Sequence, residues 1–140
     1  MRVGCVQYSA NILPLLSPNF SSSKVQITNQ QVNDLRVFNH HIYEYKHGLR
    51  NLVLTTEKAA NRDVIKAKLK REHIDYLIQD VDARKINVFF GEPNAVNVIK
   101  SFKQPKLNEY TPEQDFILGI LLGYDKKQQC ERYLKFIKSQ

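Results

Sequence analysis

Hydrophobic and polar positions follow their clearest pattern between residues 51 and 102, where strand-like alternation and helix-like spacing succeed each other. The pattern predicts a short strand over 51–55, a helix over about 57–72, and two strongly alternating strands over 74–81 and 86–90. The last two strands are separated by a short segment that includes Asp82 and Lys85, which is typical of a β-hairpin. This stretch therefore predicts a small sheet domain.

A helix is expected before the first strand. Phe38, Ile42, Tyr45 and Leu49 recur at helical spacing, and Gly48 is a C-terminal stop signal. Read as a strand, the same residues show no clean alternation, so the helical interpretation is preferred.

Three helices are expected after the hairpin. The first runs from Pro93 to Phe102, and the second begins at Thr111, which forms a capping-box pattern with Gln114. Asp125 is a candidate N-cap for the last helix. The apolar stripe expected to bury that last helix consists of Cys130, Tyr133, Leu134 and Ile137.

The order of these elements predicts an α+β fold with a two-layer, ferredoxin-like arrangement and two additional C-terminal helices. Its three-stranded mixed sheet contains strands at about 51–55, 74–81 and 86–90, with 86–90 in the centre. The helices over 57–72 and 93–102 are both expected on one face of the sheet.

Alternation divides the strand residues between two faces. The helix-covered face is expected to contain Leu52, Leu54, Ile74, Tyr76, Ile78, Ile86, Val88 and Phe90. The opposite face receives Val53, Leu77, Val81 and Phe89, which is too much apolar surface to leave in water. The C-terminal helices are the preferred cover for that face. The alternative is a second subunit, which would make a homodimer through the open sheet face.

Residues 1–34 differ in composition from the rest of the chain. Prolines and a serine run at 21–23 interrupt any periodicity, so this segment is expected to be an irregular arm, with residues 35–140 forming a single compact α/β domain. Within the arm, a short helix near 12–16 and an edge strand over 25–28 are possible elements of structure.

Composition limits the class of protein. The 140 residues suit one domain, and 42% apolar residues are enough to form a core. Cys5 and Cys130 form no paired motif, which fits a reducing cytoplasm. No run approaches the roughly 18 apolar residues of a membrane-spanning helix, and no secretory signal is evident. The sequence therefore predicts a cytoplasmic protein.

A formal net charge of +7 and a pI near 9.4 indicate a cationic surface, which attracts acidic proteins and nucleic acids. Basic residues recur every four positions from Lys58 to Lys70. The candidate partner-binding residues are Arg50, Lys66, Lys70, Arg84 and Lys85. The alternative interpretation is a solvated basic surface without a specific partner.

His40, Glu44 and His47 share one stripe of the first helix, at a spacing that could hold a metal ion. The stripe lies opposite the apolar face and lacks groups that would orient the rings, so a solvated polar surface is preferred and no cofactor is assigned. Cys130 is expected to be a buried, inert thiol. No catalytic residue is assigned.

Several segments carry a family resemblance. They are Val37–Tyr45, Gly48–Leu54, Ile74–Ile78, Lys85–Gly91, Phe116–Gly119, Leu122–Asp125 and Gln128–Tyr133. Together they resemble an uncharacterised bacterial family known as domain of unknown function 2023, and the similarity covers about Leu35 to Leu134.

The resemblance implies a small cytoplasmic α/β protein without an established activity. Members are often encoded beside flavodoxins, which are acidic electron carriers, so the resemblance also implies a flavodoxin as a specific acidic partner. The surface candidates within the shared motifs are His40, His41, Tyr43, Tyr124 and Gln129.

Three functional hypotheses follow. The leading one is a basic accessory protein, without enzymatic activity, that docks an acidic partner protein. The alternatives are a nucleic-acid-binding protein that uses the same basic groups, and a small enzyme or metal-binding protein centred on the stripe of His40, Glu44 and His47.

Overall fold

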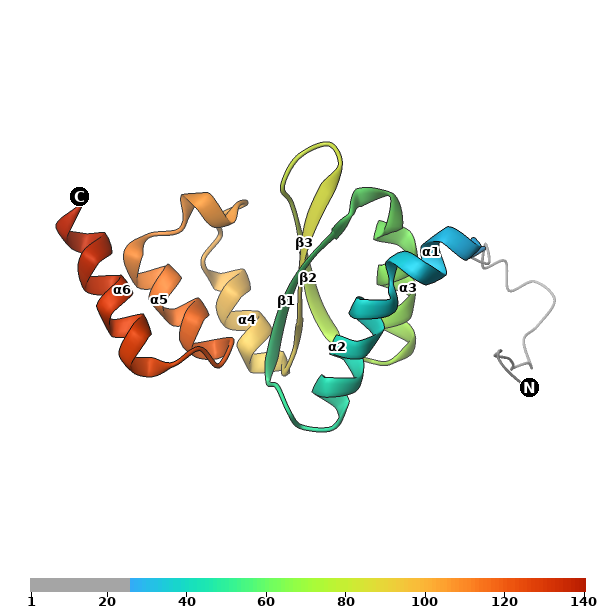
Figure 1. The fold of residues 1–140 in the computed structure, drawn as a ribbon, viewed down its shortest axis with the longest axis horizontal. Helices are drawn as coiled ribbons and strands as arrows, with labels where there is room; N and C mark the ends of the chain where they lie inside the picture. The colour runs from blue at the N-terminus through green and yellow to red at the C-terminus, as the bar shows by residue number, and fades with distance from the viewer. Residues whose placement is uncertain (1–25) are drawn as a thin grey trace.

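The computed structural model describes residues 26–140, which form one three-stranded sheet with helices on both of its faces (Figure 1). The strands are β1 (Leu52–Lys58), β2 (Asp75–Asp80) and β3 (Lys85–Gly91). The helices are α1 (Asn29–Asp34), α2 (Arg36–Lys46), α3 (Arg62–Arg71), α4 (Pro93–Ser101), α5 (Pro112–Leu121) and α6 (Lys126–Lys138). Short 3₁₀ turns span Ala59–Asn61 and Leu107–Glu109.

Strand β3 is central, and the strand order is β1-β3-β2. Both neighbours run antiparallel to β3, with Gly91 opposite Leu52 on one side and opposite Asp75 on the other. The α+β class and the central place of residues 86–90 are confirmed. The sheet is antiparallel at both pairings rather than mixed.

Helices α2 and α3 cover the first face of the sheet, where Phe38, Ile65 and Phe90 are fully buried. The rings of Phe38 and Phe90 meet edge to face, with centroids 5.5 Å apart. Helix α4 covers the second face, where Phe89 packs with Val96, and α5 adds Leu118 to the same cluster. The sheet is therefore the middle of three layers, as Figure 1 shows.

Two predicted face assignments are wrong. The helix over 93–102 lies opposite α3, not beside it, and Leu52 and Leu54 pack on the α4 face. The cause is the register, because Val53 lies directly opposite Phe90 and directly paired residues share a face. The predicted cover of the second face by helices of the same chain is confirmed, so that face is not open to a second subunit.

The start of α3 also differs from the prediction. The predicted start near residue 57 lies within β1, where the neighbouring Thr56 hydroxyl donates to Asn87 Oδ1 at 2.7 Å. The 3₁₀ turn at Ala59–Asn61 then leads into α3.

The segment before α2 is partly helical. Residues 29–34 form α1, which begins with a capping box between Thr28 and Gln31, so this part of the predicted irregular arm is ordered. Residues 26–28 are not in a strand. Residue 25 and the predicted helix near 12–16 lie outside the described residues.

The C-terminal helices begin as predicted. The Thr111 capping box and the Asp125 N-cap are both present. The predicted apolar stripe of α6 is wrong, because Cys130, Leu134 and Ile137 are exposed while Gln129 is buried. Gly119 on α5 leaves the space that the Gln129 amide occupies. Cys130 is therefore an exposed thiol.

Candidate binding groove beside strand β2

Strand β2 forms one edge of the sheet, and half of its backbone groups point away from β3. The amide of Val81 donates to the carbonyl of Lys85 at 3.0 Å, which marks a hydrogen-bonded pair. Because such pairs alternate along an antiparallel ladder, Leu77 and Gln79 bond to β3, while Tyr76, Ile78 and Asp80 direct their N–H and C=O groups outward.

The other edge supports this assignment. Glu92 donates its backbone N–H to the carbonyl of Asn51 at 2.8 Å, so even-numbered β3 residues bond to β1. The odd-numbered residues, including Asn87 and Phe89, are left to bond to β2. Within residues 26–140, no backbone group outside the ladder bonds to the outward groups of β2.

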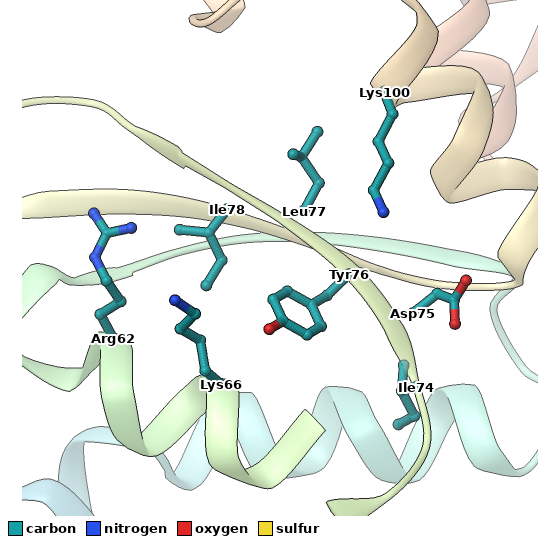
Figure 2. Close-up of a pocket in the computed structure, with 8 residues that line it drawn as sticks. All are labelled: Arg62, Lys66, Ile74, Asp75, Tyr76, Leu77, Ile78 and Lys100. Atoms are coloured by element: carbon teal, nitrogen blue, oxygen red, sulfur yellow. The ribbon is translucent and has the colours of Figure 1, made fainter. Parts of the chain in front are cut away.

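An open groove of about 590 Å³ follows this edge. Residues 74–78 form its floor, Arg62 and Lys66 line it from α3, and Lys100 lines it from α4. Figure 2 shows the two α3 cations on one side of β2 and Lys100 reaching toward the strand from the other side. The groove therefore has an extended backbone at its centre and positive charge on both flanks.

Two of these three cations are uncommitted. Arg62 pairs with Asp80 at the end of β2, whereas Lys66 and Lys100 take part in none of the ion pairs found in residues 26–140. Asp75 is the carboxylate among the lining residues. The lining alone is therefore net positive, and it suits an anionic ligand.

The structure brings together only part of the predicted partner-binding set. Lys66 lines the groove, Lys70 lies one helical turn further along α3, and Arg84 and Lys85 lie at the hairpin after β2. Arg50 lies elsewhere, because it precedes β1, which is about 20 Å long. Lys85 is opposite Lys58 at the far end of that strand.

Arg50 belongs to a separate cluster with His41 and Glu44. Its guanidinium lies 3.6 Å from Glu44 Oε1, and His41 Nδ1 lies 3.1 Å from the same oxygen. The hydrogen bond from His41 lowers the pKa of Glu44, with smaller contributions from the charges of His40 and Arg50. These groups neutralise each other on the α2 side of the molecule.

The predicted metal stripe does not converge in the structure. His40 Nε2 lies 3.7 Å from Glu44, but the His47 ring stacks on Tyr43 and its Nδ1 lies 2.9 Å from the Tyr43 carbonyl oxygen. Across residues 26–140, no three His, Cys, Asp or Glu side chains gather as a metal ion would require.

Glu57 of β1 lies close to the cluster of His41, Glu44 and Arg50, because the charge of His41 acts on it. Burial raises the pKa of Glu57, although a 2.6 Å hydrogen bond from the Thr55 hydroxyl acts in the opposite direction. A carboxyl whose pKa is raised by folding favours the folded state at low pH, and this contribution is lost as the pH rises through its folded-state pKa.

Glu57→Gln should therefore raise the melting temperature at pH 7 and change it little near pH 4, because the amide keeps an acceptor for Thr55 without the buried charge. Thermal unfolding followed by circular dichroism at both pH values checks this. Glu131→Gln, at an exposed position of α6, is the matched control and should show no such difference. A lower melting temperature for Glu57→Gln at pH 7 would contradict the assignment.

A comparison with protein families gives a clear result. The model of the family described as "Protein of unknown function (DUF2023)" matches residues 36–136. The chain belongs to this family. No curated protein matches the chain. Within residues 26–140, every helix is too short or too polar to cross a membrane.

The match to DUF2023 covers the whole groove, including Arg62, Lys66 and Lys100. The shared motif residues differ in their exposure to solvent in this DUF2023 protein. Tyr43 and Tyr124 are exposed and His41 is partly buried, but Gln129 is only 5% exposed and is therefore not a surface residue.

Lys100 is the groove residue that the sequence did not single out. Its helix was expected on the same face as α3, where Lys100 could not flank β2 from the other side. A charged residue on the outer face of an amphipathic helix carries no signal by itself.

Proposed function

We propose that this protein is a basic accessory protein that docks an acidic partner protein through the groove beside β2. The observation that carries the proposal is the placement of Arg62, Lys66 and Lys100 on two helices that flank one open strand. Complementary charge steers such partners together and fixes their orientation. We place this activity in the cytoplasm, in line with a sequence whose two cysteines form no paired motif.

An acidic protein suits the groove better than a nucleic acid. Sequence-tolerant nucleic-acid binding uses exposed aromatic platforms as well as positive charge. Here both faces of the sheet are covered by helices, and Phe89 and Phe90 are buried. The exposed edge of a strand instead offers main-chain hydrogen bonds to an extended peptide segment.

Charge reversal of the two uncommitted lysines should remove most of the binding. A flavodoxin, the partner implied by the family resemblance, is the probe, titrated by calorimetry at low and at high salt. We expect binding that weakens as salt increases, because exposed charges are screened over about 8 Å at physiological ionic strength. Lys66→Glu combined with Lys100→Glu should weaken low-salt binding at least tenfold, or about 1.4 kcal/mol.

The matched control is Lys126→Glu combined with Lys127→Glu, which makes the same change in net charge at exposed positions of α6. This control should keep most of the affinity. Equal losses in the two double variants would show that net charge, not the groove, governs binding. Absence of binding at low salt would remove flavodoxin as the partner, and a single-stranded oligonucleotide bound in its place would favour nucleic acid.

A further inference from the structure

We infer that the groove binds its partner by strand addition: an extended acidic segment pairs with β2 and becomes the fourth strand of the sheet. This inference rests on the proposed function and specifies the form of the ligand. Tyr76, Ile78 and Asp80 each offer one outward N–H and one outward C=O group in register. An exposed strand edge of this kind is a template for another strand.

In residues 26–140, the outward backbone groups of β2 have no backbone partner. Strand β2 contains no proline, and its pairing with β3 runs without interruption from Asp75 to Asp80. The 590 Å³ groove lies directly along residues 74–78, between α3 and α4. An incoming segment would therefore meet backbone groups at the centre of the groove.

Charge determines the composition of the segment. Side chains of an added strand point alternately to the two faces of the sheet. On the α3 face they would meet Lys66, and on the α4 face they would meet Lys100. Acidic residues on either face of the segment therefore find a cation.

The end of the edge is also basic. Lys106 Nζ lies 3.5 Å from the Val81 carbonyl oxygen, and Gln79 donates to the Gln104 carbonyl at 3.0 Å. The chain around residues 104–106 therefore lies beside the end of β2. Asp80 is offset by its pairing with Arg62, which leaves Asp75 as the opposing charge at the start of the strand.

The same charges disfavour a second copy of this chain as the occupant. Pairing two β2 edges would bring Lys66 and Lys100 of one copy against the equivalent cations of the other. Like charges in such positions are destabilising. The electrostatic interaction with the groove is therefore favourable for an acidic partner and unfavourable for an identical copy.

The direct test measures amide hydrogen exchange by NMR in the whole protein. The probe is an acetylated and amidated seven-residue peptide of alternating Glu and Thr, and the control is the same peptide with Lys in place of Glu. At saturation with the acidic peptide in low salt, exchange at Tyr76, Ile78 and Asp80 should slow at least tenfold. Leu77 and Gln79 already donate to β3 and should change little.

A matched pair of variants tests the same contact through affinity. Asp80→Asn and Asp80→Pro both remove the carboxylate that pairs with Arg62, but only proline also removes the outward N–H. Asp80→Asn should bind the peptide at least as tightly as the natural protein. Asp80→Pro should bind at least tenfold more weakly than Asp80→Asn. If the proline variant does not fold, the exchange measurement alone decides.

The possible results distinguish strand addition to β2 from acidic docking in general. Peptide binding without slower exchange at the three outward amides would overturn strand addition and leave acidic docking in place. Binding of an acidic protein but not the peptide would also overturn strand addition by a short segment. Failure of both ligands at low salt would end the proposed function. Exchange that slows with protein concentration alone would identify a second copy as the occupant and overturn the inference.

Discussion

Phe90→Ala should destabilise the protein by about 3–5 kcal/mol, the usual cost of removing a fully buried phenylalanine from a core. Phe90 has no exposed surface and lies on the central strand, where it faces both Phe38 and Tyr45. The ring centroids are 5.5 Å and 6.4 Å away, both in edge-to-face orientation. The substitution removes the packing of two aromatic neighbours and leaves a cavity under α2.

Urea unfolding followed by circular dichroism measures this loss. A typical domain has only about 5–15 kcal/mol of stability, so Phe90→Leu is the milder companion if the alanine variant is largely unfolded. Phe136→Ala on α6, where the ring is partly exposed, is the control for losing a phenylalanine and should cost clearly less. A loss below about 1 kcal/mol for Phe90→Ala would contradict the central position of this ring.

Gly91→Ala is the second substitution expected to have a large effect. Gly91 ends β3 opposite both Leu52 and Asp75, and its φ of +147° is one that residues with a side chain rarely adopt. A Cβ atom there would lie 2.3 Å from the backbone oxygen of Asn51. Backbone cannot move aside as a flexible side chain can, so we expect a loss of about 3 kcal/mol or more from strain and displacement of β1.

Gly48→Ala separates these two causes. Gly48 also has a positive φ, +73°, but an added Cβ would meet no atom within 4 Å. This control should cost about 1–2 kcal/mol from backbone conformation alone. Equal losses at the two glycines, measured by urea unfolding, would show that the contact with Asn51 is unimportant.

The sequence predicts the elements well where a single local signal is sufficient. The two hairpin strands predicted over 74–81 and 86–90 alternate strongly in sequence. The capping residues Thr111 and Asp125 begin their helices as expected. These features depend on residues close together in the chain, so no knowledge of the rest of the fold is required.

The assignment of faces is less predictable, for a physical reason. Leu52 and Val53 are adjacent and both fully buried, because helices cover both sides of β1. Alternation shows that they point to opposite faces but not which helix each one meets. Only the pairing of Val53 with Phe90 decides, and this register depends on residues almost forty positions apart.

The arrangement of the groove also depends on residues that are far apart in the chain. Lys66 was expected from its place on a basic helix face, but its relation to Lys100 requires α4 to lie on the opposite side of the sheet. On α6, the apolar Leu134 indicated which face of the helix would be buried, but Leu134 is exposed. Gln129 is buried instead, because Gly119 of α5 has no side chain and leaves room for the Gln129 amide. A contact made possible by an absent side chain gives little signal in a pattern of hydrophobic residues.

The position of β3 also has a consequence for synthesis on the ribosome. Strands β1 and β2 lie on opposite sides of β3, so a nascent chain that ends before residue 85 can make helices but no sheet. The hairpin brings β2 and β3 together locally, and β1 must then be captured across a loop that contains α3. The last strand to leave the exit tunnel is therefore the one on which tertiary structure depends.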